Sequence, residues 1–184
     1  MVLGLRTDMP MVVLRATQKL LKILPGSGVS SVTSTTALGD WYVNRIIVDR
    51  QPLLLLVSSK SLLTAVTTAR DVKALPRRLA SIVGKRLSRL GISQSALASE
   101  VEASSVVTVA KTADRSVLGQ MVDFAKAIPF YLQESGWDED DLKVVEDRLA
   151  ETPCRASGRF EGVIFPREMT VRLLESRWSI GTVH

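Results

Sequence analysis

Residues 38–68 constrain the fold most, because they hold three strand-like runs separated by only two short turns. The first run, Leu38–Arg50, is rich in aromatic and β-branched residues and alternates along part of its length. The second, Leu53–Val57, is continuously apolar, and the third is Leu62–Thr68. Turns this short join antiparallel strands, so the pattern predicts a three-stranded meander with Leu53–Val57 in the centre of the sheet.

Two further strands and two long helices are predicted outside the meander. Residues 11–16 and 106–110 are apolar and rich in valine, as buried strands are. Residues 76–90 begin with proline at a first helical turn, and residues 116–128 repeat apolar side chains at three- and four-residue steps until Pro129 ends or kinks the helix. The sequence therefore predicts an α+β fold, in which a mostly antiparallel sheet (meander 38–68 plus strands 11–16 and 106–110) packs against helices 76–90 and 116–128.

Residues 91–107 allow two interpretations. Gln94–Ala98 looks like the opening of a helix-turn-helix motif, a DNA-binding element. However, Glu102 stands where the glycine of the turn is usual, and Val106–Val109 prefers a strand to a recognition helix. We therefore expect a short helix, Ser93–Val101, that leads directly into a strand.

The length and composition are those of one domain of ordinary core size, with 46% hydrophobic residues among 184. We expect an N-terminal arm (1–10), a single α+β domain (11–156) and a peripheral C-terminal extension (157–184). The longest apolar stretch, Pro52–Val57, is far shorter than the roughly 20 residues that span a bilayer, so no membrane contact is expected. The N-terminus shows no apolar signal region, and we expect a cytoplasmic protein.

The chain contains one cysteine, Cys154, and one histidine, His184. A single cysteine cannot form an intrachain disulfide, and one histidine makes a Cys/His zinc site and histidine acid–base chemistry implausible. We expect no metal and no cofactor. Cys154 follows Pro153 and has no histidine close in sequence, so we interpret it as a small buried residue and not as a nucleophile.

Charge is divided unevenly along the chain, whose formal net charge is +5. Residues 1–99 hold 14 Lys/Arg against 4 Asp/Glu, whereas residues 100–184 hold 10 against 15. The basic half suits a polyanion such as nucleic acid, and the acidic region 134–151 suits a basic protein partner. Alternatively, the two halves lie against each other in one fold or across a homodimer.

The densest basic surface is predicted on helix 76–90. Arg78, Lys85 and Arg89 fall within roughly 40° of one another at about 100° per residue, opposite the apolar face, and Arg77 and Arg86 flank them. Such a face contacts a phosphate backbone in nucleic-acid-binding proteins. A simple solvated face remains the alternative, because no stacking aromatic side chains are interleaved with the charges.

A second candidate site lies at the polar corner between strand 106–110 and helix 116–128. Free N–H groups at the start of a helix attract anions, and Lys111, Arg115 and Ser116 stand at that position. The alternative is structural: Asp114 or Ser116 caps the helix with its side-chain oxygen. Both interpretations fit the sequence.

Four separated motifs, which recur in order, carry a family resemblance. The segments are Leu14–Lys22 (LRATQKLLK), Ser34–Tyr42 (STTALGDWY), Lys111-Thr112 with Arg115–Gly119 (RSVLG) and Asp123-Phe124, and Leu149–Cys154 (LAETPC). Together they resemble a family of small uncharacterised bacterial proteins; in longer relatives a similar segment precedes a plasmid- or transposon-passenger-type domain. The resemblance implies no known activity, and it marks Asp40, Trp41 and Asp123 as motif residues. Val122 departs from it, since many relatives have asparagine beside the aspartate.

The sequence favours a binding domain over an enzyme. We predict that it holds nucleic acid or another phosphate-bearing partner through Arg78, Lys85, Arg89, Lys111, Arg115 and Ser116. The first alternative is a protein-interaction module, such as a toxin–antitoxin-like or mobile-element accessory partner. The second is a metal-independent nuclease with candidates Asp40, Lys111, Arg115, Ser116 and Asp123, but no recognised catalytic spacing joins them.

Overall fold

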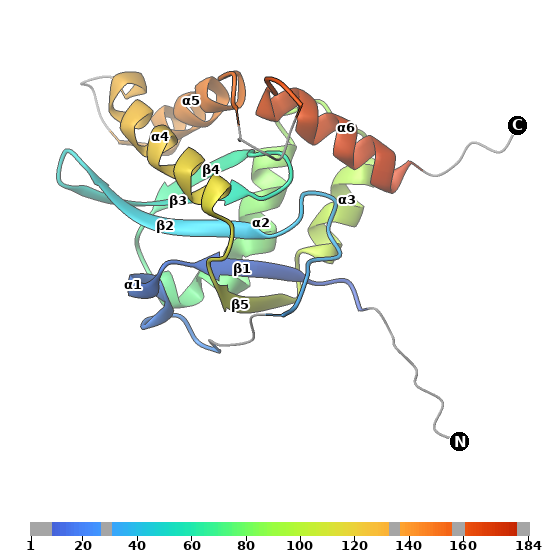
Figure 1. The fold of residues 1–184 in the computed structure, drawn as a ribbon, viewed down its shortest axis with the longest axis horizontal. Coiled ribbons are helices and arrows are strands. Elements are labelled where there is room, and N and C mark those ends of the chain that lie inside the picture. The colour runs from blue at the N-terminus through green and yellow to red at the C-terminus, as the bar shows by residue number, and fades with distance from the viewer. Residues whose placement is uncertain (1–8, 27–30, 133–136, 156–160, 180–184) are drawn as a thin grey trace, which may run out of the picture.

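In the computed structural model, five strands form one mixed sheet in the order β4-β3-β2-β1-β5 (Figure 1). The structure describes residues 9–26, 31–132, 137–155 and 161–179. The strands are β1 (Val12–Ala16), β2 (Trp41–Val48), β3 (Gln51–Ser58), β4 (Thr64–Thr68) and β5 (Val107–Lys111). The helices are α1 (Gln18–Leu21), the 3-10 turn η1 (Val72–Ala74), α2 (Leu75–Leu87), α3 (Gln94–Ala103), α4 (Arg115–Tyr131), α5 (Glu139–Ala150) and α6 (Pro166–Trp178).

The predicted meander and the α+β class are confirmed. β2, β3 and β4 pair antiparallel in chain order, with Asn44 opposite Leu55 and Leu55 opposite Val66. β1 instead lies parallel to both β2 and β5, which makes the sheet mixed although mostly antiparallel. All five residues of β1 are buried, as expected of a strand in a parallel pair whose two faces are covered. β3 is an interior strand, but β2 and not β3 takes the central position.

Both faces of the sheet are covered by helices, which explains the uninterrupted leucines of β3. Leu54 and Leu56 pack into the core shared with α2 and α6, whereas Leu53, Leu55 and Val57 pack into the core shared with α4 and α5. Alternate side chains of a strand point to opposite faces, so a strand between two helical layers is apolar at every position. In Figure 1, α4 crosses in front of the strands and α2 lies behind them.

Several element ends differ from the sequence-based expectation. α4 continues to Tyr131, past Pro129, because a proline near the end of a helix removes one hydrogen bond while the next turn still closes from the Leu132 N–H to the Ile128 carbonyl. α3 runs into β5, so the described residues contain no second helix of a helix-turn-helix motif there.

The C-terminal helix packs closely against the rest of the fold. Leu174 on α6 is fully buried in the core on the α2 side of the sheet, and the Thr170 hydroxyl donates a hydrogen bond to Ser61 Oγ at 2.8 Å. No helix in the described parts of the chain is long and apolar enough to cross a membrane. Most of the predicted N-terminal arm, and also His184, lie outside the described residues.

Candidate basic cleft

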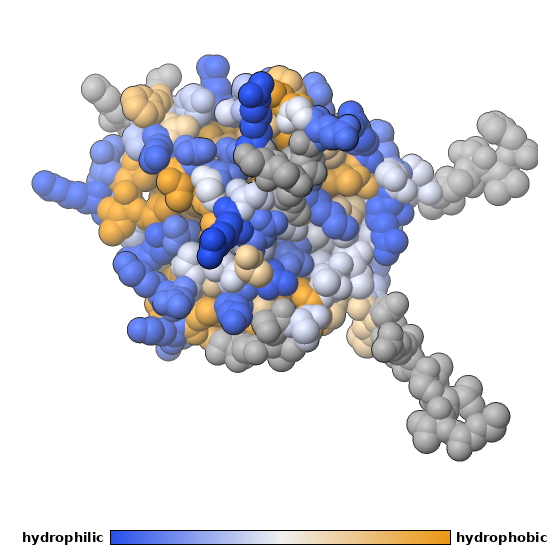
Figure 2. All heavy atoms as spheres, viewed as in Figure 1, coloured by the Kyte–Doolittle hydropathy of each residue, from blue (hydrophilic) through white to orange (hydrophobic). Residues whose placement is uncertain are grey.

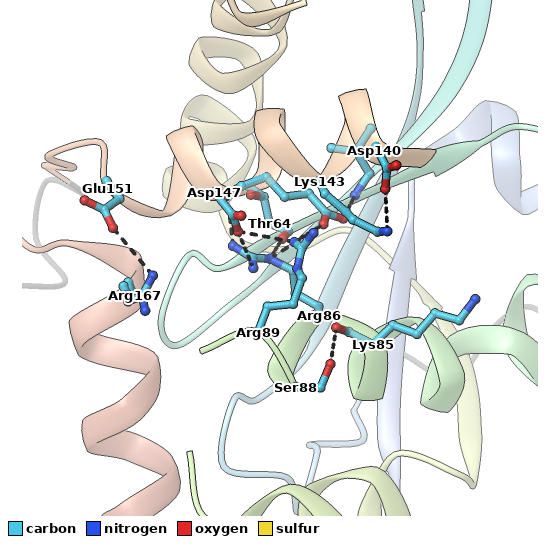
Figure 3. A network of polar contacts seen from close by, with 12 residues as sticks. Thr64, Lys85, Arg86, Ser88, Arg89, Asp140, Lys143, Asp147, Glu151 and Arg167 are labelled. Carbon is cyan, nitrogen blue, oxygen red and sulfur yellow. Dashed lines mark hydrogen bonds and ion pairs between the residues drawn. The ribbon is translucent and has the colours of Figure 1, made fainter. Parts of the chain in front are cut away.

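The predicted basic face of α2 meets the acidic helix α5 across the outer edge of β4 (Figure 3). Arg86 was expected at the flank of an exposed surface, and this expectation is wrong: its side chain is 1% exposed. Its guanidinium donates to the Thr64 carbonyl at 2.9 Å, to the Glu146 carbonyl at 2.9 Å and to Asp147 at 3.0 Å. Arg86 therefore satisfies the Thr64 carbonyl, which the edge strand would otherwise bury unpaired, and adds a second hydrogen bond to a carbonyl of α5.

Glu146 completes the contact between the helices and the sheet edge. One of its carboxylate oxygens accepts from the Val66 N–H at 2.7 Å, and the other accepts from Arg89 at 2.5 Å. Burial raises the pKa of Glu146 and lowers the pKa of Arg86, in each case against the opposing attraction of the pair. Some of the positive charge in the basic half of the sequence is thus neutralised within the fold, by ion pairs between α2 and α5.

A cleft of about 220 Å³ lies beside this network, between α2, α5 and β4. Arg78, Lys85 and Arg89, the three cations predicted for a basic face, all line it. Thr67, Thr68 and Lys143 also line it, and the sequence analysis did not select them. The threonines lie within a strand and the lysine within an acidic helix, so no local pattern marks them as neighbours of α2.

The cations of the cleft differ in how far they are paired. Arg89 contacts Glu146 and also Asp147 at 3.3 Å, yet its Nε and Nη1 are buried with no hydrogen-bond partner in the described part of the chain. Lys143 pairs with Asp140 at 2.7 Å, and this hydrogen bond raises the pKa of Lys143 and lowers that of Asp140. Among the described residues, Arg78 donates only to the Arg70 carbonyl, at 3.4 Å.

Lys85, like Lys143, is an exposed cation of this surface. Its side chain lines the cleft, points away from the contacts of Arg86 and Arg89 (Figure 3), and has no ion-pair partner among the described residues. Arg78 and Lys85 therefore keep positive charge that no carboxylate of the described chain neutralises by direct contact.

At the other candidate site, the start of α4, the structure shows a capped helix. The Asp114 carboxylate accepts from the Ser116 N–H at 2.8 Å, from the Ser116 hydroxyl at 2.7 Å and from the Val117 N–H. The capping alternative thus describes this corner, and the first N–H groups of the helix already have an acceptor. The side chains of Lys111 and Arg115 are exposed beside it.

The motif residue Asp40 forms an ion pair that sequence reasoning missed. Its partner is Arg15 on β1, a buried guanidinium that also donates to the Lys111 carbonyl at 3.0 Å. The Asp40 carboxylate further accepts from the Ser34 hydroxyl at 2.6 Å. Arg15 and Asp40 thereby join β1, the end of β5 and the loop before β2, three segments far apart in the sequence.

The remaining motif residues and nuclease candidates do not gather into one cluster. Trp41 is fully buried in the core, whereas Asp123 is exposed on α4, two turns beyond Ser116. Cys154 is 1% exposed, and burial, together with the charge of Asp123, raises the pKa of its thiol to about 11. The prediction of a small buried cysteine is confirmed. Within the described ranges, no group of three or more His, Cys, Asp or Glu residues could hold a metal ion.

The basic residues of α2 and Lys111 lie at opposite edges of the sheet. Arg78, Lys85 and Arg89 flank the β4 edge, and Lys111 ends β5 at the other edge. Three strands lie between β4 and β5, so the two edge strands are four strand spacings apart. At about 4.8 Å per spacing, the distance between them is roughly 19 Å. A single phosphate group cannot contact both.

Comparison with known proteins gives a family and no activity. The comparisons with curated proteins and with solved structures found no match. Residues 13–169 match the family model described as "Domain of unknown function (DUF6933)". Because this match covers most of the chain, from β1 into α6, the chain belongs to that family.

Proposed function

We propose that this domain binds a phosphate-bearing partner, nucleic acid being the first candidate, in the cleft between α2, α5 and β4. One observation carries the proposal: Arg78 and Lys85 converge on a cleft that also presents the threonines of the β4 end, and no described carboxylate pairs with either cation.

The chemistry of the cleft suits a phosphate better than a neutral ligand. Lys and Arg side chains neutralise phosphate oxygens, and threonine hydroxyls donate hydrogen bonds to them. Thr67 and Thr68 are half-buried, and their hydroxyls have no hydrogen-bond partner among the described residues. Arg86 and Arg89 hold the walls of the cleft together through α5, so the contacting pair is Arg78 and Lys85.

Lys111, Arg115 and Ser116 stay in the proposal as additional contacts. Since Lys111 ends the strand at the opposite sheet edge and Arg115 and Ser116 follow it at the start of α4, only an extended polyanion could contact them and the cleft together. We therefore expect Lys111→Ala or Arg115→Ala to weaken binding of a long oligonucleotide but not of inorganic phosphate, and to change stability by no more than about 1 kcal/mol, as at exposed sites.

The test is fluorescence anisotropy with labelled single-stranded RNA and DNA over a range of salt concentrations. Each phosphate contact adds roughly 0.7 to the slope of log affinity against log salt, so the two cations account for roughly 1.4. The double variant Arg78→Glu/Lys85→Glu should lose binding. Arg89 stays unchanged, because a carboxylate there would face Glu146 and test stability instead.

Arg77→Glu is the matched control, since Arg77 is exposed on the same helix and lies outside the cleft. An equal loss in this variant would show general charge attraction and would contradict the cleft as the site. If the wild-type protein binds neither oligonucleotide at low salt and no inorganic phosphate, the phosphate proposal is wrong. Binding of inorganic phosphate but of neither oligonucleotide would exclude nucleic acid as the partner and would support the cleft as a phosphate site.

A protein-interaction role is the second candidate, and exposed apolar side chains favour it. Phe130, near the end of α4, is 86% exposed, and Ile47 in the β2–β3 hairpin is 69% exposed. Figure 2 shows mostly polar surface on the α4 side of the molecule, with hydrophobic surface gathered around that hairpin on the left. A partner protein, a homodimer or a mobile-element accessory complex could cover such side chains. Light scattering of wild type and Phe130→Asp tests the homodimer: if both are monomeric, it is excluded.

We keep the cytoplasm as the proposed location. The single cysteine is buried and can form no intrachain disulfide, which suits a reducing compartment. Fractionation of cells that express the full chain tests this location directly.

A further inference from the structure

A second pocket, of about 490 Å³, lies between the loop that precedes β2 and the last turns of α6. Its walls carry two cations, Lys60 from the β3–β4 turn and Arg177 from α6. Hydroxyl side chains such as Ser176 line the rest, with Leu173 as the apolar part. The pocket shares no residue with the α2–α5 cleft. Its volume falls in the range of sites for small molecules.

The described lining of this pocket contains no acidic residue. Lys60 and Arg177 are both exposed, and neither has an ion-pair partner among the described residues. Two positive charges thus face the pocket without a lining carboxylate, whereas the α2–α5 cleft mixes its cations with Glu139 and Glu146. The described lining of this pocket is therefore positively charged, without a carboxylate that would compete with an anionic ligand.

Both cations are positioned by their surroundings. The Arg177 guanidinium lies 5.2 Å from the centre of the Trp178 ring and donates to the Thr35 carbonyl at 3.4 Å. The turn that carries Lys60 packs against Gly39, where a Cβ would lie 2.9 Å from Lys60 Cγ. Because Gly39 has no side chain and a φ of +74°, the turn can approach the loop closely enough to bring Lys60 to the pocket.

A buried carboxylate ties the two walls together. Glu100 on α3 is fully buried and accepts from the N–H groups of Ala37 and Leu38, at 2.8 and 3.0 Å, on the loop side. On the α6 side it accepts from Trp178 Nε1 at 2.7 Å. The loop and the helix therefore have a fixed relation before any ligand arrives, as a preorganised binding site requires.

We propose that this pocket binds the phosphate group of a small phosphorylated molecule. A phosphate monoester carries a charge of about −1.5 to −2 at pH 7, which matches Lys60 and Arg177, whereas a monocarboxylate would neutralise one of them. The volume exceeds that of a phosphate alone, and Leu173 offers apolar contact to an attached organic group. This site is independent of the proposed function, which concerns the α2–α5 cleft.

The test is nitrogen-15 NMR of the full chain titrated with phenyl phosphate, inorganic phosphate and benzoate. We expect saturable shifts at the amides of residues 34–37 and 176–177, with phenyl phosphate binding more tightly than the other two probes. Arg177→Glu and, separately, Lys60→Glu should each weaken the binding of phenyl phosphate at least about tenfold, because each variant loses one charge-assisted contact.

Arg172→Glu is the matched control, since Arg172 is exposed on α6 outside this pocket. A similar loss in the control, or equal binding of benzoate and phenyl phosphate, would overturn the proposal. Shifts confined to the α2–α5 cleft would also overturn it while supporting the proposed function. If Arg177→Glu changes the whole spectrum and so fails to fold as wild type does, the decision rests on Lys60→Glu, because the Lys60 side chain is exposed.

Discussion

Replacing Arg86 with methionine tests whether the contact between α2 and α5 holds the edge of the sheet. Methionine keeps most of the aliphatic volume but removes every hydrogen bond of the guanidinium. The Thr64 carbonyl, on a fully buried residue, then loses its partner outside the sheet. A buried polar group without a partner costs about 1–3 kcal/mol.

The other two contacts of Arg86 contribute less. The Glu146 carbonyl lies inside α5 and can keep its helical hydrogen bond, and the Asp147 side chain is 51% exposed and still faces Arg89. Burial disfavours the charged form of Arg86, and methionine removes this cost. The removal partly offsets the free energy lost with the hydrogen bonds. We therefore expect Arg86→Met to lower the free energy of unfolding by about 1–3 kcal/mol, a substantial share of the 5–15 kcal/mol of a typical domain.

The measurement is urea unfolding followed by circular dichroism. Lys85→Met is the control, because Lys85 is next to Arg86 in the sequence and its side chain is exposed. We expect this variant to change the free energy of unfolding by no more than about 0.5 kcal/mol. If Arg86→Met lowers the free energy of unfolding by less than about 1 kcal/mol, and the slope of that free energy against urea concentration is unchanged, this prediction is wrong. The Thr64 carbonyl would then have another hydrogen-bond partner.

Three further predictions concern the core, a glycine and the cysteine. Leu55→Asp places an unpaired charge on a fully buried position of β3, at a cost comparable with total stability, and should leave no cooperatively melting soluble protein; soluble protein with wild-type melting would contradict the interior placement. Gly39→Ala puts a Cβ 2.5 Å from Ser59 Oγ at a positive φ and should lower the melting temperature, whereas Gly26→Ala, also at positive φ but with no atom within 4 Å, should lower it less. The raised pKa of Cys154 means that the folded state holds its proton more tightly, so stability is unaffected below pH 9 and falls as pH rises to about 11, by up to roughly 3 kcal/mol. Cys154→Ser should flatten this part of the stability profile and leave any binding activity intact; an identical slope in both proteins would show that other groups cause it.

The strands and helices could be predicted from the sequence because their signals are local. The apolar run at Leu53–Val57 already implies a strand with both faces covered, and the valines of residues 106–110 outweigh the helix-turn-helix-like opening before them. The neighbours of β1 could not be predicted, since a short apolar strand has the same pattern whether its partners are parallel or antiparallel.

The contacts of the candidate sites depend on residues far apart in the sequence. Helical spacing places Arg86 beside the apolar face, but its partners Thr64 and Asp147 are 22 and 61 positions away. The same holds for Arg15 with Asp40, where only folding reveals which cation meets which carboxylate. Helix geometry could identify a basic face on α2, but not which of its charges α5 would neutralise.

The interior position of β1 has a consequence for synthesis of the chain. Val12 pairs with Val107, so β1 waits for a partner that the ribosome adds 95 residues later. At about 5–20 residues per second this delay is roughly 5–20 s. Until then the nascent domain carries an apolar strand with one edge open, a binding site for chaperones and a template for wrong pairing. The strand that is buried along its whole length in the finished sheet is thus the first of the five to be made, and it gains its second neighbour only when the last strand is made.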